Sequence, residues 1–557
     1  MRVRRRPEVA RVITVVKFVH DSVRRERSLQ WHPVKRPPIH ALVLTAILLA
    51  GAGVRFVGLG FGLPHTQARP DELRVAQTAV DFLGGDLSPG FFNYPTLFMY
   101  AAGAAYAGYC APRILTGEVV SLAACGATWH ADWVPFFIIP RILSALAGIW
   151  TIWLVYRIGA RLIDGTAALA AALFLAFAFL HVRDSHFGVT DVPMAALVMA
   201  AILALVRAHD APSCRRFAIA GALAGLAAST KYNALFLAAP AIVSQIDARR
   251  LDSRLPVFGA AMGGAFLAGS PFVLIDRARF WADATSEAAH LAAGNGIILD
   301  IGWRHHFTVS LWYGMTWPLL AAALVGAVAM IVMSPRRAAL LLAFPIVYYA
   351  VAGRGYTVFA RYMIPVVPFL CLTAGFALSQ LAARLGRTRG SAVAAVTALA
   401  LVAPSAWKSI QLDRLLMRTD SRVLAAEWIG SHVRKGSSLY QTGSIYVQTQ
   451  VPPHGGLPRF AIWEFDGRRR QFDSSSGRTP EWPQWIVILE SPLLIYTTIP
   501  EAVREGLKQY QLRYAVKAVD LNAARVYDQQ DAWFLPLDGF ERLGRPGPNV
   551  SIYERRD

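Results

Sequence analysis

The sequence predicts a polytopic α-helical membrane protein that ends in a soluble α/β domain. Hydrophobic residues make up 55% of the 557 residues and charged residues only 17%, a balance typical of membrane proteins. Long apolar runs recur from about residue 41 to residue 406 and then stop. After Trp407 the hydropathy falls, and amphipathic and strand-like segments follow.

The segment 1–38 forms a basic arm. Four arginines stand in its first six positions, and apolar residues such as Val9, Val12 and Val16 alternate with later basic ones. This pattern is typical of an interfacial helix on anionic headgroups at the cytoplasmic face, and a disordered tail is the alternative. The first apolar stretch begins only near residue 40 and no convincing cleavage site follows it, so we predict no cleavable signal peptide.

The first two spans set the predicted topology. The first runs from about Ala41 to Leu63, and with the basic arm inside, the next loop lies outside. The next clear span, about Val134 to Tyr156, is followed by two arginines, which is typical of the inner side. The apolar stretch from Pro95 to Tyr109 then reads as an interfacial or re-entrant helix. Residues 64–133 therefore form one long outer loop.

Further apolar runs bring the predicted number of spans to about eleven. Arginines concentrate in the inner loops between them, so the net charge of +20 reflects topology rather than a nucleic-acid surface. We assign residues 39–406 to a transmembrane domain of the cytoplasmic membrane, with the N-terminus in the cytoplasm. The runs lie near residues 165–181, 192–206, 217–230, 232–246, 256–275, 307–333, 338–352, 362–382 and 391–406.

Residues 407–557 read as an α/β domain, which an odd number of spans places outside the cytoplasm. An amphipathic helix is predicted over Ser421–Val433, and a second helix begins at Pro500, since proline suits a first turn. Strands are predicted at Trp485–Glu490, Leu512–Val519 and Val550–Tyr553.

Two of the four cysteines share the predicted outer loop. A disulfide between Cys110 and Cys125 is chemically allowed on that side of the membrane. Two unrelated thiols are nevertheless the interpretation that the sequence favours.

The outer loop opens with paired carboxylates. Asp71 and Glu72 follow Arg69 and precede Arg74, just beyond the first span. A carboxylate there can accept a proton from an incoming hydroxyl, while guanidinium groups can hold a phosphate. The alternative is a solvated acidic turn at the start of a short helix.

Three more ionisable residues fall at the outer ends of predicted spans. Asp191, Lys231 and Arg361 are costly to bury there unless each faces a cavity or a partner. Without a role in chemistry, Asp191 would be an N-cap, Lys231 a snorkelling lysine and Arg361 an interfacial anchor. Several outer-face histidines, His186 among them, match no metal-ligand spacing, so we predict no metal site.

These motifs together resemble bacterial family 39 glycosyltransferases, which are relatives of protein O-mannosyltransferases and of the lipid A aminoarabinose transferase. All belong to the C-type glycosyltransferase superfamily. The resemblance covers about residues 40–380, and the basic arm and the C-terminal domain lie outside it. The segments that carry it are Arg69–Glu72, Gly85–Leu97, Pro140–Gly148, His181–Pro193 and Gly225–Tyr232.

The resemblance implies an inverting transferase that takes a sugar from a polyprenyl-phosphate carrier at the outer face. By similarity, Asp71 is the catalytic carboxylate and Asp191 is the acidic residue of the second outer loop. Glu72 orients the acceptor or holds an arginine, and no metal is obligatory because a phosphate leaving group needs charge neutralisation more than protonation. Further substrate-binding positions are Arg69, Asn93, Tyr94, Arg141, His186, Lys231 and Arg361.

Two other functions remain open for the sequence. A lipid or sugar transporter of the same topology would tend to show inverted repeats and broken helices at the midplane, and we find neither. A catalytically silent scaffold would tolerate Asp71→Asn. The sugar is not specified, and a glycolipid, a polysaccharide and a protein hydroxyl are all compatible acceptors.

Overall fold

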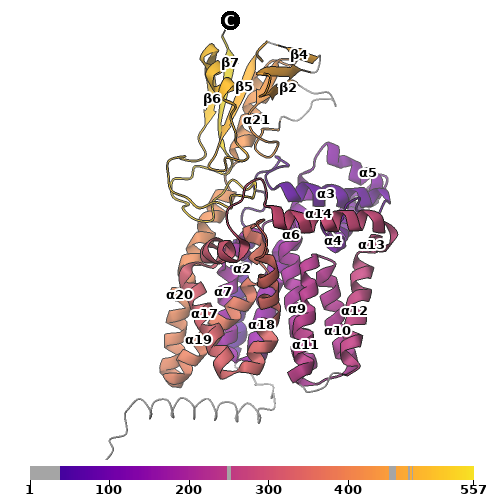
Figure 1. The fold of residues 1–557 in the computed structure, drawn as a ribbon, viewed down its shortest axis with the longest axis vertical. Coiled ribbons are helices and arrows are strands. Elements are labelled where there is room, and N and C mark those ends of the chain that lie inside the picture. Colours follow the sequence, from indigo (N-terminus) through magenta and orange to yellow (C-terminus); the bar gives the residue numbers. More distant parts are fainter. Residues whose placement is uncertain (1–37, 248–251, 451–459, 475–476, 480, 557) are drawn as a thin grey trace, which may run out of the picture.

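The computed structural model describes residues 38–247, 252–450, 460–474, 477–479 and 481–556. The predicted basic arm lies outside the described residues, apart from its last position. A helical bundle forms one end of the molecule and a β-sheet forms the other, with a layer of shorter helices beside the junction (Figure 1).

Within the described part of the chain, five helices are long and apolar enough to cross a membrane, or six if a bent pair counts as one span. The chain is thus a multi-pass membrane protein. The predicted number of about eleven stays a prediction, because other helices of the bundle, such as α7 (Gly165–Phe177) with 13 residues and α12 (Arg254–Gly269) with 16, are shorter. The span candidates are Ile39–Phe56, Val134–Leu162, Asp191–Asp210, Val367–Arg384 and Arg389–His432, and the bent pair is Gly302–Met315 with Trp317–Met333.

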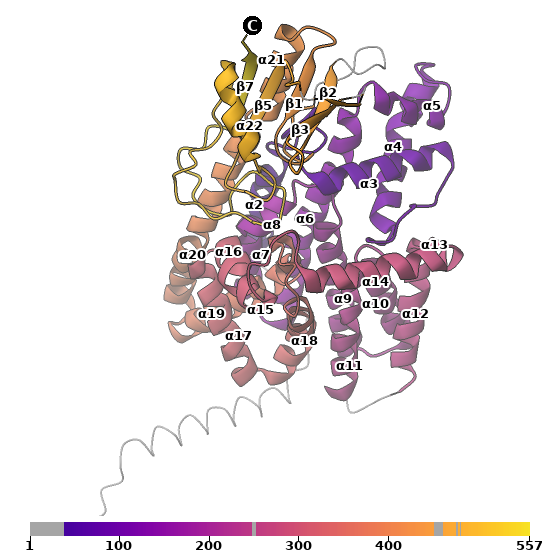
Figure 2. The ribbon, with the colours of Figure 1, turned by 45° about the horizontal axis from the view of Figure 1, so that its top comes forward.

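The bundle helices run side by side (Figures 1 and 2), and the side chains of α9 are mostly buried whereas those of α2 are mostly exposed. Apolar residues nearly all round α9 fit its burial among other helices. The bundle comprises α2 (Pro38–Phe56), α6 (Val134–Leu162), α7 (Gly165–Phe177), α9 (Asp191–Asp210), α10 (Cys214–Ala228), α11 (Ala238–Asp247), α12 (Arg254–Gly269), α17 (Trp317–Met333), α18 (Pro335–Ala352), α19 (Val367–Arg384) and α20 (Arg387–Leu416).

The layer beside the junction comes from the predicted outer loops. Helices α3 (Pro70–Asp81) and α14 (Arg277–Ala293) run across the end of the bundle, and α4 (Leu97–Leu115) and α5 (Leu122–Ala127) lie at the same end (Figures 1 and 2). Helix α4 covers all but the first two residues of the stretch that the sequence predicts to be interfacial or re-entrant. It is not among the helices that qualify as spans.

A disulfide joins Cys110 of α4 to Cys125 of α5, so the favoured prediction of two unrelated thiols is wrong. After α4 the chain turns back, and α5 packs against the end of α4, which brings the two Cα atoms to 6.0 Å. Both cysteines are fully buried. Spacing in the sequence does not reveal this return of the chain.

The C-terminal region holds a seven-stranded mixed sheet in the order β4-β3-β2-β1-β5-β7-β6. Its predicted strands are confirmed as β5, β6 and β7, and the predicted helices as α21 (Ser421–His432) and α22 (Glu501–Gly506). Strands β1 to β4 were not predicted, because they are short or alternate with charged residues. The strands are β1 (Ser438–Gln441), β2 (Ala461–Asp466), β3 (Gln471–Ser474), β4 (Gly477–Thr479), β5 (Trp485–Glu490), β6 (Tyr510–Val516) and β7 (Asn549–Arg555).

The loop between β6 and β7, residues 517–548, docks the sheet domain onto the bundle. Its Trp533 packs edge-on against Phe61 and Phe187, with ring centroids 5.1 and 4.8 Å away. The side chain of Gln530 accepts a hydrogen bond from the Val358 amide at 2.6 Å. Apolar residues of this β6–β7 loop belong to the same buried core as the bundle helices, so the two parts pack as one body.

Candidate active site

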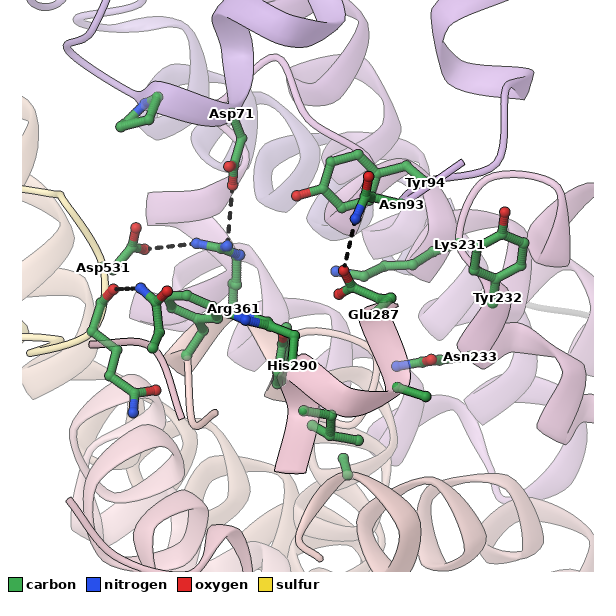
Figure 3. A pocket seen from close by; sticks show the side chains of 18 of the residues that line it. Asp71, Asn93, Tyr94, Lys231, Tyr232, Asn233, Glu287, His290, Arg361 and Asp531 are labelled. Carbon is green, nitrogen blue, oxygen red and sulfur yellow. Dashed lines mark hydrogen bonds and ion pairs between the residues drawn. The ribbon is translucent and has the colours of Figure 1, made fainter. Parts of the chain in front are cut away.

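A cavity of about 660 Å³ lies where the bundle, the helical layer and the sheet domain meet. Five polar residues that line it come from separate segments of the chain: Asp71, Asn93, Lys231, Glu287 and Arg361 (Figure 3). Tyr446 and Tyr496 of the sheet domain complete the wall. Five of the ten predicted site residues line this cavity: Asp71, Asn93, Tyr94, Lys231 and Arg361.

Asp71 stands in the first turn of α3, directly after Pro70. Proline suits this position because its missing N–H is not needed there, and a carboxylate in the first turn is stabilised by the helix dipole. The Asp71 side chain is 28% exposed and points into the cavity, where its Oδ2 lies 3.1 Å from Nη2 of Arg361 and 3.6 Å from Nη2 of Arg69 (Figure 3). The predicted acidic helix start is therefore also a cavity residue.

Glu72 points the other way and does not line the cavity. Its Oε2 lies 2.6 Å from Nη2 of Arg141, and its Oε1 accepts a hydrogen bond from the Gly188 amide at 2.7 Å. A Cβ at Gly188 would come within 2.8 Å of Pro140, so only glycine allows this approach. The buried ion pair of Glu72 and Arg141 links α3 to α6. Of the two roles expected for Glu72, orienting the acceptor or holding an arginine, this contact is the second.

Lys231 and Asp191 meet at the cavity edge. Lys231 follows α10 and its Nζ lies 2.6 Å from Oδ1 of Asp191, the first residue of α9. The Lys231 ammonium also lies 5.3 Å from the ring centroid of Tyr362, which lines the same cavity. Asp191 itself is 3% exposed and does not line the cavity, and its ion pair with Lys231 is what connects it to the cavity wall.

The remaining predicted residues divide between the cavity and the interior. Asn93 donates a hydrogen bond from Nδ2 to Oε2 of Glu287 at 3.2 Å, which ties the outer loop to α14 (Figure 3). The Tyr94 side chain lines the cavity, and the charge of Asp71 together with burial raises its pKa. His186 is fully buried, and its ring nitrogens lie 3.0 Å from the carbonyl oxygens of Val182 and Val57, away from the cavity.

Arg361 is shared between two carboxylates from different domains. Its Nη2 contacts Asp71, and its Nη1 lies 3.0 Å from Oδ2 of Asp531, a residue of the β6–β7 loop (Figure 3). The same Asp531 also pairs with the buried Arg69. Burial alone would raise the pKa of Asp531, but the charges of Arg69 and Arg361 hold it below its usual range.

Sequence reasoning missed Asp531, Glu287 and the two tyrosines of the sheet domain. Asp531 and the tyrosines lie beyond the segment that resembles known enzymes, and nothing in their local sequence shows which loop of the domain docks. Glu287 lies on α14, where acidic and apolar residues read as an ordinary amphipathic surface. Among the described residues, no group of three or more His, Cys, Asp or Glu side chains is arranged to hold a metal ion.

Comparison with known proteins addresses the fold directly. Residues 139–275 match the family model described as dolichyl-phosphate-mannose-protein mannosyltransferase. The structure of ArnT from Cupriavidus metallidurans in the apo state superposes with a TM-score of 0.53 at 14% identity, over 92% of this chain and 97% of that chain. Part of the chain thus matches this mannosyltransferase family model, and the chain shares the fold of ArnT.

Two further solved structures are similar to this chain. ArnT from Cupriavidus metallidurans bound to undecaprenyl phosphate matches with a TM-score of 0.50 at 16% identity, over 74% of this chain and 84% of that chain. The oligosaccharyltransferase of Archaeoglobus fulgidus gives a TM-score of 0.48 at 13% identity over 75% of this chain, which spans 61% of that enzyme. No curated protein matches the chain by sequence.

Proposed function

We propose that the chain transfers a sugar from a polyprenyl-phosphate carrier to a hydroxyl acceptor, with inversion at the anomeric carbon. The observation that carries this proposal is the joint presence of Asp71, Arg361 and Lys231 in one cavity. One proton acceptor and two cations are the groups that displacement of a phosphate by an alcohol requires.

In the proposed step, the acceptor hydroxyl attacks the anomeric carbon and gives its proton to the Asp71 carboxylate. The new bond joins the acceptor oxygen to that carbon, and the bond from the carbon to the phosphate oxygen breaks. The electron pair leaves with the lipid phosphate, which gains one negative charge. Attack from the face opposite the phosphate inverts the configuration. A positioned general base of this kind contributes roughly 100-fold to 10,000-fold to the rate.

Lys231 and Arg361 would stabilise the charge that develops on the departing phosphate. Lys231 is held by Asp191 at 2.6 Å, so its ammonium is oriented before the donor binds. Both cations are mostly buried, and electrostatic interactions are stronger in such surroundings than in water. These residues would act without proton transfer to the phosphate, which is a good leaving group once its charge is neutralised.

The comparisons support a polyprenyl-phosphate donor. The matched family is described by a dolichyl-phosphate sugar, and one ArnT structure of the same fold was solved with undecaprenyl phosphate. The description of the matched family names a protein as the acceptor. For this chain we leave the acceptor open, because glycolipids, polysaccharides and protein hydroxyls all carry the hydroxyl that the step needs.

We further propose that the cavity faces the outside of the cytoplasmic membrane. Asp191 begins α9 at the cavity, so the arginines that follow the other end of α9, Arg215 and Arg216, lie at the far side of the bundle. Arginine-rich loops favour the cytoplasmic side, which places the cavity and the C-terminal domain outside. In this arrangement residues 39–406 form the transmembrane domain and residues 407–557 the outer domain.

The proposal is tested by reconstituting the full chain in liposomes with undecaprenyl-phosphate mannose and a panel of other undecaprenyl-phosphate hexoses and pentoses. Released undecaprenyl phosphate and the anomeric configuration of the product are measured with an alkyl glycoside acceptor. We expect release with at least one donor and an inverted product. A retained configuration would indicate a covalent intermediate, and no release with any donor would reject the transferase function.

A further inference from the structure

Two aspartates and two arginines alternate around one corner of the cavity. Asp71 contacts Arg69 and Arg361 at 3.6 and 3.1 Å, and Asp531 contacts the same two arginines. Arg69 is fully buried, and Arg361 and Asp531 are nearly so. Each arginine therefore serves one carboxylate from the membrane domain and one from the sheet domain.

We propose that Asp531 is a positioning residue that keeps Asp71 available as the base. This inference rests on the proposed function and gives the C-terminal domain a part in the reaction. Asp531 neutralises much of the charge of the two arginines and holds their guanidinium groups in place. Arg361 can then exchange Asp71 for the donor phosphate while it stays attached to Asp531.

The segment around Asp531 is built to hold this carboxylate still. Asp528 accepts a hydrogen bond from the Ala360 amide at 2.8 Å, one residue before Arg361. Gln530 accepts from Val358 and donates from Nε2 to the carbonyl oxygens of Ile297 and Tyr356 at 2.7 and 2.9 Å. Four hydrogen bonds to backbone groups thus fix the loop beside the arginine that it serves.

Without Asp531, two buried guanidinium groups would act on Asp71 alone. A carboxylate that faces two uncompensated cations gives up its negative charge less readily, so it becomes a weaker proton acceptor. Tyr94 also interacts electrostatically with Asp71, and Arg183, Asp528 and Tyr496 do so with Asp531. Lys231, Glu287 and His290 line other parts of the cavity.

The test compares the full-length wild type with Asp531→Asn, Asp531→Glu and Asp538→Asn in liposomes. Asp538 is the matched control: it belongs to the same β6–β7 loop and also bridges the domains, through Lys408 of α20 at 2.9 Å, but it does not line the cavity. The probe is undecaprenyl-phosphate mannose, or whichever undecaprenyl-phosphate sugar the wild type turns over. The readouts are kcat, donor KM and the pH dependence of kcat.

For Asp531→Asn we expect kcat to fall about tenfold or more and the acid limb of the pH profile to move down by about one pH unit or more. Donor KM should change less than kcat, since Arg361 still reaches the phosphate. Asp531→Glu keeps the charge, so its acid limb should stay at the wild-type position while its kcat falls. Asp538→Asn should match the wild type.

An unshifted acid limb in an active, folded Asp531→Asn variant overturns the inference and leaves the proposed function standing. If the Asp531→Asn variant does not accumulate, the Asp531→Glu variant decides. A wild-type kcat in Asp531→Glu overturns the inference, because a carboxylate displaced by one methylene should shift Arg69 and Arg361. A shift of the same size in Asp538→Asn would also overturn it, since the effect would then belong to domain docking. An inactive wild type rejects the proposed function and this inference together.

Discussion

Lys231 places its Nζ 2.6 Å from Oδ1 of Asp191, although 40 residues separate them in the chain. Asp191 opens α9 at the cavity, and Lys231 follows the end of α10. The two helices run antiparallel and pack closely, so the start of one meets the end of the other. This pairing places a cation at the cavity wall with its counter-ion behind it.

Removing either member of this pair should weaken use of the donor phosphate. We expect Lys231→Met to raise donor KM and lower kcat, because a cation at the phosphate is lost. Asp191→Asn should give a smaller loss, since Lys231 keeps its charge but loses its orientation. Steady-state kinetics in liposomes measures both, and Asp210→Asn at the other end of α9 is the control. A larger defect in Asp191→Asn than in Lys231→Met would contradict this assignment of roles.

Glu72 and Arg141 should matter for stability more than for chemistry. Breaking a fully buried ion pair leaves an uncompensated charge, so Glu72→Gln should cost about 3–5 kcal/mol. The double variant Glu72→Gln with Arg141→Met should be more stable than Glu72→Gln alone. Thermal unfolding midpoints in detergent test this order. A double variant that is less stable than either single variant would show that the pair is not the source of the effect.

The disulfide between Cys110 and Cys125 closes a loop across a sequence separation of 15 residues. By loop-closure entropy, its removal should destabilise the outer layer by about 3 kcal/mol. We expect a mobility shift on reduction in the wild type that is absent from Cys110→Ser, together with a lower unfolding midpoint. Cys214→Ser, which removes an exposed free thiol, is the control. An unchanged mobility of the wild type on reduction would contradict the bridge.

Asp528 should make stability depend on pH. Burial, with the neighbouring Asp531, raises its pKa to about 7, against about 3.9 in an unfolded chain. Between these values the folded state binds the proton and the unfolded state does not, so this contribution to stability is complete below about pH 4 and is lost as the pH rises to about 7.

Unfolding midpoints between pH 4.5 and 7.5 should therefore decline less steeply in Asp528→Asn than in the wild type, since the amide does not titrate. Asp520→Asn in the same β6–β7 loop is the control, and its pH dependence should follow the wild type. Parallel curves for the wild type and Asp528→Asn would show that Asp528 does not carry the effect.

Much of the membrane domain could be predicted because it depends on local patterns. Apolar runs and arginine-rich loops are readable without knowledge of contacts, and the motif around Asp71 indicates a chemical site. The number of spans was harder, because helices such as α7 and α12 are shorter than a typical span. The pairing of Cys110 with Cys125 depends on how α4 and α5 return on each other, which no local pattern specifies.

The candidate site was predicted in part. Asp71, Lys231 and Arg361 share motifs near span ends, where an ionisable group has a clear physical cost. Glu72 and Arg141 are also ionisable residues near span ends, yet they form a buried ion pair away from the cavity. The energetic cost of burying a charge therefore does not show whether a residue lines a site or packs in the interior. Nothing in the local sequence marks Asp531, because its contacts with Arg69 and Arg361 form only when the sheet domain packs on the bundle.

The most direct test of the account is kcat of Asp71→Asn for release of undecaprenyl phosphate from the donor that the wild type uses. Asp86→Asn is the matched control, since Asp86 lies on the same outer segment but does not line the cavity. We expect Asp71→Asn to lose roughly 100-fold to 10,000-fold in kcat while Asp86→Asn stays near the wild type. Wild-type turnover by purified Asp71→Asn would contradict the central claim that this carboxylate is the base.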